Sequence, residues 1–358
     1  MSKFYPLQVA SIRQETRDTI IATLAVPPTM RARFAFTQGQ HLTLRARVND
    51  EELRRSYSIC SATQDGDLRV AIKRTAGGRF SCWANDTLKA GVTIDVMPPA
   101  GHFNLPLVPE RARRYLGVAA GSGITPIFSI VKTTLAAEPA STFTLVYGNR
   151  SSSTVIFREE LADLKDLYRD RLNIVHVMSR EQQDIDLFNG RITREKCDEL
   201  FERWINVHAH DAAFVCGPGA MMSAVSEALQ ARGMPKAAIK VELFAASIPK
   251  SEHIQHQRPV VGRQECDVTV IIDGSHRSYT MAKDTESVLD AGLKQGIDIR
   301  YSCKGGVCST CRCKVLEGKV EMDANYALED YEIARGFILS CQAFPVTDRI
   351  VLDFDSDT

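Results

Sequence analysis

Cys303-Lys-Gly-Gly-Val-Cys308-Ser-Thr-Cys311 is the stretch that decides the fold, and a lone Cys341 follows it after a gap of twenty-nine residues. The order C-x4-C-x2-C…C is the ligand spacing of a [2Fe–2S] cluster, in which three thiolates share one tight loop and the fourth arrives from elsewhere. Gly305 and Gly306 allow the loop to adopt positive φ and to bring backbone N–H groups near the sulfurs. The spacing therefore predicts a metal site formed by Cys303, Cys308, Cys311 and Cys341.

A four-cysteine zinc site is the competing interpretation of these residues. Zinc sites usually pair two short C-x2-C units, a pairing that this stretch lacks. We therefore favour the cluster. An iron–sulfur cluster does not generate electrons, so the rest of the chain has to contain their source.

Length and composition suggest a multidomain protein of the cytoplasm. The 358 residues exceed what one hydrophobic core usually serves, and 44% hydrophobic and 25% charged residues are ordinary for globular proteins. No apolar run is long enough to cross a membrane, and the N-terminus lacks the apolar core of a signal peptide. The six cysteines outside the cluster motif are scattered, which fits a reducing compartment. No nucleic-acid-binding motif is present, so we expect neither nucleic acid nor membrane as a partner.

The formal net charge of zero is unevenly distributed. Residues 266–358 contain 10 Lys and Arg against 16 Asp and Glu, a net charge of −6, whereas residues 1–265 contain 34 against 28, a net charge of +6. An acidic C-terminal module could dock electrostatically on the rest of the chain or on a partner protein. An uneven distribution of this size can also arise by chance.

Residues 1–108 indicate an antiparallel β-barrel that binds a flavin. Short β-rich runs alternate with Gly, Pro, Asn and Asp, namely Leu7–Ile12, Thr19–Val26, His41–Val48, Leu68–Ile72 and Thr93–Met97. Arg55, Tyr57 and Ser58 then provide a cation for phosphates, an aromatic face for the ring and a hydroxyl for N5. We add the next residue, Ile59, to this candidate set.

A second phosphate-binding element, Gly77-Gly78-Arg79-Phe80-Ser81, precedes an expected helix over Ser81–Leu88. Backbone amides at a junction between glycines and a helix bind phosphate. The competing interpretation is an ordinary loop with a serine helix cap. Gly78 and Ser81 are the candidate ligands of this element.

Residues 109–245 change to alternating strands and helices, which predicts a parallel, doubly wound nucleotide-binding sheet. The expected strands are Tyr115–Ala120, Phe143–Tyr147, Leu172–Val177 and Ala213–Cys216, and the expected helices are 126–136, 155–167, 193–201 and 220–231. The turn Gly121-Ser-Gly123-Ile-Thr125-Pro126 lies between the first strand and the first helix, where glycines allow a pyrophosphate to approach. Arg150 and Ser151 follow the second strand, where an arginine suits the 2′-phosphate of NADPH better than NADH.

Residues 246–265 have no periodic apolar pattern and are expected to be a linker. In residues 266–358, a strand pair, a helix over Ser287–Gln295, the cysteine loop and further strands predict an α+β, β-grasp domain. Cys313 is expected to face away from the metal site on the strand after the loop. The predicted order is therefore flavin barrel, nucleotide domain, linker and iron–sulfur domain.

These motifs resemble the ferredoxin–NADP reductase superfamily, and the cysteine loop with Leu339-Ser340-Cys341-Gln342 resembles plant-type ferredoxins. The resemblance implies FAD as the flavin. It also implies that Cys216, Glu242 and Phe244 lie on the nicotinamide side of the flavin, with Ser58, Cys216 and Glu242 as catalytic residues. A core phenylalanine and a buried small cysteine are the alternatives for Phe244 and Cys216.

Over its full length the chain is most similar to the reductase components of ring-1,2-phenylacetyl-CoA epoxidases, in Glu51–Cys60, Ala119–Pro126, Val146–Arg150 and Tyr301–Cys308. The resemblance implies electron transfer from NADPH through FAD and the cluster to a separate diiron oxygenase that epoxidises phenylacetyl-CoA. Three alternatives remain: a reductase for another oxygenase, such as a Rieske dioxygenase or a hydroxylase, a reductase for a hybrid-cluster protein, and an iron–sulfur redox sensor.

Overall fold

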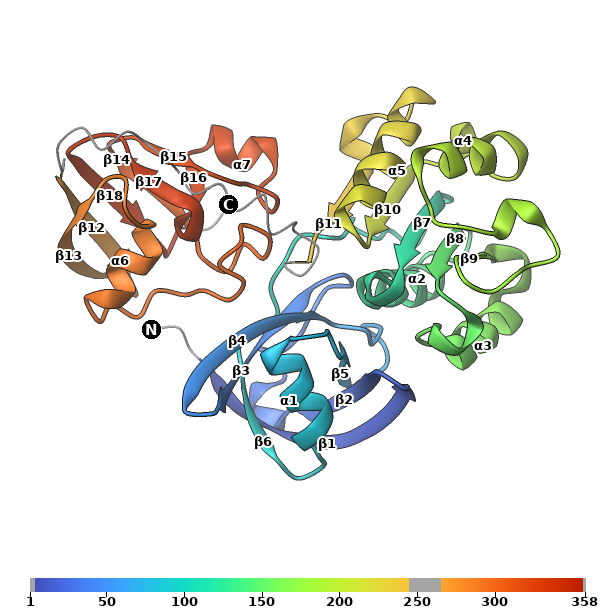
Figure 1. The fold of residues 1–358 in the computed structure, drawn as a ribbon, viewed down its shortest axis with the longest axis horizontal. Helices are drawn as coiled ribbons and strands as arrows, with labels where there is room; N and C mark the ends of the chain where they lie inside the picture. Colours follow the sequence, from blue (N-terminus) through green and yellow to red (C-terminus); the bar gives the residue numbers. More distant parts are fainter. Residues whose placement is uncertain (1–3, 245–264, 357–358) are drawn as a thin grey trace. The chain divides into compact units, whose positions relative to one another are not determined.

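The computed structural model describes residues 4–244 and 265–356. The chain divides into two compact units (Figure 1). The larger unit contains residues 5–53 and 57–242, and the other contains mainly the C-terminal part from Leu243 onward. The linker expected over 246–265 lies outside the described residues except for Glu265. Among the described residues, no helix combines the length and apolar character that crossing a membrane requires.

Six antiparallel strands form the first sheet, in the order β4-β3-β6-β1-β2-β5. The strands are β1 (Tyr5–Thr16), β2 (Thr19–Ala25), β3 (His41–Val48), β4 (Glu51–Ser58), β5 (Leu68–Lys73) and β6 (Thr93–Val96). A bridge between Ile59 and Val70 joins the end of β4 to β5 and closes the barrel. Its core contains alternating residues such as Leu42, Leu44 and Val96, each at most 1% exposed. The predicted antiparallel barrel is confirmed.

Helix α1 (Arg79–Thr87) lies beside the barrel strands (Figure 1). It begins two residues earlier than expected. The sequence predicts a start at Ser81. In the structure Gly78 is the N-cap residue, and the N–H of Cys82 donates to its carbonyl at 2.9 Å. Ser81 therefore lies within the first turn of α1.

A five-stranded parallel sheet follows, in the order β11-β10-β7-β8-β9. Its strands are β7 (Arg114–Ala120), β8 (Thr142–Asn149), β9 (Leu172–Met178), β10 (Ala212–Cys216) and β11 (Ile239–Glu242), and its helices are α2 (Ile124–Ala137), α3 (Arg158–Tyr168), α4 (Arg194–Arg203) and α5 (Gly219–Ala231). The strand order reverses beside β7, with β8 on one side and β10 on the other. In doubly wound sheets, ligands bind at such a switch point, outside the carboxyl ends of the strands.

Contacts between the barrel and the parallel sheet explain why both lie in one compact unit. The Ser129 hydroxyl on α2 donates to the carbonyl oxygen of Ser61 at 2.7 Å. The N–H of Phe157 donates to the Glu15 carboxylate on β1 at 2.6 Å. These buried or half-buried polar contacts hold the flavin-type and nucleotide-type folds against each other.

The C-terminal unit is an α+β fold with the sheet order β13-β12-β18-β14-β16. Its elements are β12 (Glu265–Ile272), β13 (Ser275–Ala282), α6 (Val288–Lys294), β14 (Arg312–Glu317), β15 (Val320–Met322), α7 (Asp330–Ala334), β16 (Phe337–Leu339), β17 (Ala343–Pro345) and β18 (Arg349–Asp353). Strands β12 and β18 are parallel, and the other pairs in this sheet are antiparallel. The strand pair β12–β13 is followed by the helix α6, and the last strand, β18, lies in the middle of the sheet beside β12. This is the predicted β-grasp arrangement.

Candidate functional site

Strand β4 positions the first group of predicted flavin ligands. The Tyr57 ring lies 5.7 Å from the Phe80 ring on α1, centroid to centroid, which connects this strand to the helix. Arg55 is exposed, two residues before Tyr57, and its guanidinium donates to the Arg54 carbonyl at 2.7 Å. Ile59 is a core residue whose N–H already donates to the Gln40 carbonyl at 2.8 Å. Its assignment as a ligand remains a prediction.

The first turn of α1 has the form of an anion site. A Cβ at Gly78 would lie 2.5 Å from the Ser81 hydroxyl and 3.0 Å from the Thr75 carbonyl, so a larger residue does not fit there. Ser81 Oγ accepts the Thr75 N–H at 3.1 Å and thereby closes the loop. Gly77 has φ +72° and open space around its Cβ position. The loop thus leaves room beside the N–H groups that begin a nine-residue helix, as phosphate binding requires.

Gly123 brings two loops into contact at the switch point of the parallel sheet. A Cβ on this residue would lie only 2.1 Å from the carbonyl oxygen of Cys216, the last residue of β10. Gly121 has φ +53° and nothing near its Cβ position, and the Thr125 hydroxyl donates to the Ser122 carbonyl at 3.0 Å. The turn that the sequence analysis assigns to a pyrophosphate therefore passes directly beside the end of β10.

The three predicted catalytic residues lie close together in the larger of the two compact units. Cys216 on β10 is paired in register with Glu242 on β11. The Ser58 hydroxyl on β4 donates to Glu242 Oε2 at 3.2 Å. Ser58 is 5% exposed and Cys216 is fully buried. A hydroxyl, a carboxyl and a thiol from three separate strands thus meet where the barrel and the parallel sheet adjoin.

Burial controls the protonation of this group. Glu242 is half-buried, and desolvation of its carboxyl raises the pKa to about 8; the hydrogen bond from Ser58 opposes the shift without cancelling it. Desolvation, with the nearby Glu242 carboxyl, also raises the pKa of the Cys216 thiol well above its usual value. Both groups are therefore predominantly protonated at neutral pH, and Cys216 is not an activated thiolate.

A second arginine adjoins Arg150 at the ends of β8 and β9. The N–H of Arg180 donates to the carbonyl of Arg150 at 2.8 Å, and both residues are exposed. The sequence analysis missed Arg180. The parallel register of β8 with β9, which pairs Asn149 with Met178, could have indicated it, because the carboxyl ends of parallel strands meet at one edge.

Serines and a glutamate also lie in the loops that follow β8 and β9. Ser151 forms a reciprocal capping arrangement with Thr154, and its hydroxyl lies 3.0 Å from that of Ser153. Glu181 accepts the Ser152 N–H at 2.8 Å and the Ser152 hydroxyl at 2.9 Å. These bonds lower the pKa of the Glu181 carboxyl. This carboxylate is therefore engaged within the loop.

Phe244 is partly exposed and follows β11. The division of the chain falls between Glu242 and Leu243, so Phe244 belongs to the other compact unit. Its proposed stacking on the flavin remains a prediction from the resemblance.

The four predicted cluster ligands are neighbours. The Cys303 side chain lies near enough to those of Cys308 and Cys341 for them to affect its pKa, and the Cys341 side chain is affected in the same way by Cys303 and Cys311. Among the described residues, no three His, Cys, Asp or Glu side chains surround a single metal-ion position. The fit to a cluster therefore rests on the proximity of four thiols, which is the donor set that two bridged irons require.

Backbone and side-chain N–H groups point at these sulfurs. The Gly305 N–H donates to Cys303 Sγ at 3.3 Å, and the Gln342 amide donates to Cys341 Sγ at 3.7 Å. Such bonds stabilise thiolate charge and set the potential of a cluster. Cys313 lies on β14, is 1% exposed and packs in the same core as Cys311 and Cys341, so its exclusion from the ligand set remains a prediction.

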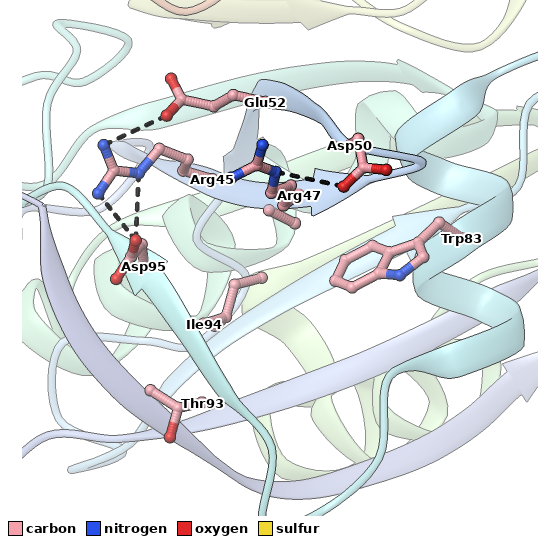
Figure 2. Close-up of a pocket in the computed structure, with 9 residues that line it drawn as sticks. Arg45, Arg47, Asp50, Glu52, Trp83, Thr93, Ile94 and Asp95 are labelled. Carbon is pink, nitrogen blue, oxygen red and sulfur yellow. Dashed lines mark hydrogen bonds and ion pairs between the residues drawn. The ribbon is translucent and has the colours of Figure 1, made fainter.

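A pocket of about 690 Å³ opens on the barrel, and none of the predicted site residues lines it (Figure 2). Its walls include Trp83, Ala46 and Ile94. Arg45 on its rim is already paired with Asp95 at 2.8 Å. The charged side chains in this pocket pair with one another, and we assign it no part in the site.

Family models match all three parts of the chain. The oxidoreductase FAD-binding domain matches residues 6–105, the oxidoreductase NAD-binding domain matches residues 118–227, and the 2Fe-2S iron-sulfur cluster binding domain matches residues 270–346. The cofactors of the chain are therefore FAD, a nicotinamide nucleotide and a [2Fe–2S] cluster.

Relatives match over almost the whole length. The chain is 48% identical to one of the component chains of the 1,2-phenylacetyl-CoA epoxidase of Escherichia coli, covering 99% of each chain. It is 36% identical to the ferredoxin reductase component of 3-ketosteroid-9-alpha-monooxygenase of Rhodococcus rhodochrous, covering 97% of this chain and 96% of the relative. The solved structure of phthalate dioxygenase reductase shares the fold, with a TM-score of 0.60 at 24% identity and 98% coverage of both chains. The chain belongs to the family of oxidoreductases that join an FAD domain, an NAD domain and a C-terminal [2Fe–2S] ferredoxin domain, the family that includes this component of 1,2-phenylacetyl-CoA epoxidase.

Proposed function

We propose that this chain carries electrons from NADPH to a separate diiron oxygenase that epoxidises phenylacetyl-CoA. The chain is an oxidoreductase that serves as the reductase component of a multicomponent oxygenase, and the oxygenase identity is the part proposed here. The observation that supports it is the 48% identity to a component chain of 1,2-phenylacetyl-CoA epoxidase over 99% of both chains. The FAD, NAD and [2Fe–2S] domains in one chain support the coarser role of a reductase component.

FAD, when bound, supplies the chemistry that divides a two-electron transfer into single-electron transfers. The cluster supplies one-electron delivery. Arg55 and the first turn of α1 around Gly78 and Ser81 would hold the FAD phosphates. Tyr57 would pack against the flavin ring. Ser58 would present its hydroxyl, and Glu242 would hold a proton on its carboxyl one hydrogen bond away from Ser58.

The residues at the ends of β8 and β9 support NADPH rather than NADH as the electron donor. Gly121, Gly123 and Thr125 would admit the pyrophosphate to the turn before α2, and Arg150, Arg180 and Ser151 would hold the 2′-phosphate. A carboxylate that binds ribose hydroxyls is the usual feature of NADH sites. Glu181, which follows Arg180, accepts two hydrogen bonds from Ser152 on one of its oxygens.

The test is reconstitution of the purified holoprotein with the purified diiron oxygenase of phenylacetyl-CoA epoxidase, NADPH and phenylacetyl-CoA. Formation of the ring epoxide, measured by mass spectrometry, is the expected result. The matched comparison replaces the oxygenase with that of a 3-ketosteroid 9α-monooxygenase, because the second relative belongs to such a system. Steroid hydroxylation without epoxide formation would contradict the proposal.

A further inference from the structure

One buried tyrosine is hydrogen-bonded to the turn that we assign to the pyrophosphate. Tyr147, near the end of β8, is 0% exposed, and its hydroxyl donates to the carbonyl oxygen of Gly121 at 3.1 Å. Gly121 is the first residue of the turn Gly121–Gly123 and has φ +53°. A glycine has more accessible backbone conformations than any other residue. A bond from a buried side chain is therefore well placed to fix this turn.

The surroundings of the hydroxyl decide where its hydrogen points. The Ile156 N–H donates to the Tyr147 oxygen at 3.3 Å. A backbone N–H can only donate, and a hydroxyl has one hydrogen, so that hydrogen is left for Gly121. Burial raises the pKa of the Tyr147 phenol, which therefore stays protonated and able to donate at neutral pH.

The Ile156 side of this arrangement is itself fixed. Ile156 is 0% exposed, and the N–H of its neighbour Phe157 donates to the Glu15 carboxylate on β1 at 2.6 Å. The Tyr147 hydroxyl thus joins an anchored backbone segment to the glycine turn. Without the hydroxyl, the turn would lose its link to that segment.

The direction of the Gly121 carbonyl sets the direction of the next N–H. The peptide bond between Gly121 and Ser122 is trans, so its C=O and N–H point in opposite directions. The Gly121 oxygen accepts the Tyr147 hydroxyl and the Ile124 N–H. The Ser122 N–H therefore points away from Tyr147 and from the first turn of α2. Nothing lies within 4 Å of a Cβ position at Gly121, which leaves space beside the turn for a phosphate oxygen.

We propose that Tyr147 is a positioning residue for nucleotide binding, whose hydroxyl fixes the turn so that the Ser122 N–H faces the pyrophosphate. This inference rests on the proposed place of the pyrophosphate at the turn before α2, and it does not depend on the oxygenase. NADPH and NADH share the pyrophosphate. Tyr147 should therefore support the binding of both nucleotides equally, whereas Arg150 should support that of NADPH alone.

The test uses the full-length protein with FAD and cluster bound, with Tyr147→Phe as the variant and Tyr115→Phe as the matched control. Tyr115 is also a buried tyrosine of the parallel sheet, and its hydroxyl donates to Glu138 at 2.9 Å. It lies at the beginning of β7, whereas Gly121 follows the end of that strand. Each variant loses one oxygen atom, so flavin and cluster absorbance should be retained in both.

We expect the dissociation constants of NADP⁺ and NAD⁺, measured by calorimetry, to rise about three- to tenfold in Tyr147→Phe and to stay unchanged in Tyr115→Phe. The KM for NADPH in ferricyanide reduction should rise by the same factor. Flavin reduction at saturating NADPH should keep its wild-type rate constant, because the hydroxyl acts on the turn and not on the reacting atoms.

N-benzyl-dihydronicotinamide, a hydride donor without phosphate groups, separates this role from a general loosening of the site. It should reduce the flavin equally fast in the wild type and in Tyr147→Phe. Slower reduction by this donor would place the effect on the flavin side, and a loss confined to NADP⁺ would assign Tyr147 to the 2′-phosphate loop. Wild-type affinities for both nucleotides, or equal losses in both variants, would leave Tyr147 no specific role at the turn. Each of these four results overturns the proposal, and none of them bears on which oxygenase receives the electrons.

Discussion

Replacement of Glu242 by Gln should remove a pH dependence that the structure predicts for flavin reduction. Burial raises the pKa of this carboxyl to about 8. About one carboxyl in ten is then ionised at pH 7 and about nine in ten at pH 9. An ionised Glu242 would place a negative charge beside Ser58, where a hydride is expected to arrive, and would oppose its transfer.

The assay is stopped-flow reduction of the holoprotein by saturating NADPH between pH 6 and 9. If only the protonated form is competent, the observed rate constant falls about tenfold between pH 7 and pH 9, in proportion to the protonated fraction. Glu242→Gln keeps a neutral side chain of similar shape, so its rate should stay level across this range. Glu227→Gln on α5, which changes an exposed carboxyl, is the matched control and should follow the wild type.

The same pKa affects stability, with a definite sign. A carboxyl whose pKa is higher in the folded than in the unfolded state makes the folded protein bind more protons in the interval between the two values. Unfolding free energy should therefore fall as pH rises from 4.5 to about 8, and Glu242→Gln should reduce that fall. A glutamine variant with the pH profile of the wild type in both rate and stability would refute the reasoning.

Three further predictions concern other parts of the site. Arg150→Ala and Arg180→Ala should each weaken NADPH binding by roughly 1.5–3 kcal/mol, the range for hydrogen bonds to charged groups, and leave NADH binding unchanged in titrations; equal losses for both nucleotides would make the arginines structural. Glu332→Gln should destabilise the C-terminal unit by about 3–5 kcal/mol in chemical denaturation, because the buried ion pair with Arg312 would be lost; wild-type stability would contradict the role of this pair. Cys313→Ser should retain two irons per chain in metal analysis, and loss of iron would return Cys313 to the ligand set.

Local spacing carried much of the fold prediction. The C-x4-C-x2-C stretch located the cluster loop because three ligands must come from one tight turn. The parallel sheet followed from buried β-rich runs that alternate with helices, and β3 agrees with the expected His41–Val48 at both ends. Short elements were harder to find: α7 has only five residues and buries one of them, Glu332, so it has no apolar periodicity to detect.

Contacts between distant segments lay beyond the sequence alone. Cys216 and Glu242 are twenty-six residues apart, and only the register of β10 with β11 pairs them. The hydrogen bond from Ser58 to Glu242 depends on how the barrel packs against the sheet. Arg180 was missed for a similar reason, because its proximity to Arg150 depends on the ends of two adjacent strands.

The most direct test of the electron path compares the wild type with Cys308→Ser in full-length, FAD-loaded protein. Both proteins are mixed anaerobically with NADPH in a first step, and cluster and flavin absorbance are followed. In a second step they are mixed with the diiron oxygenase, phenylacetyl-CoA and O2, and epoxide is followed. We predict that NADPH reduces the flavin in both, and that only the wild type shows cluster bleaching, oxygenase reduction and epoxide formation. Epoxide formation at the wild-type rate by a Cys308→Ser protein without its cluster would contradict the account, because the cluster would then lie off the electron path.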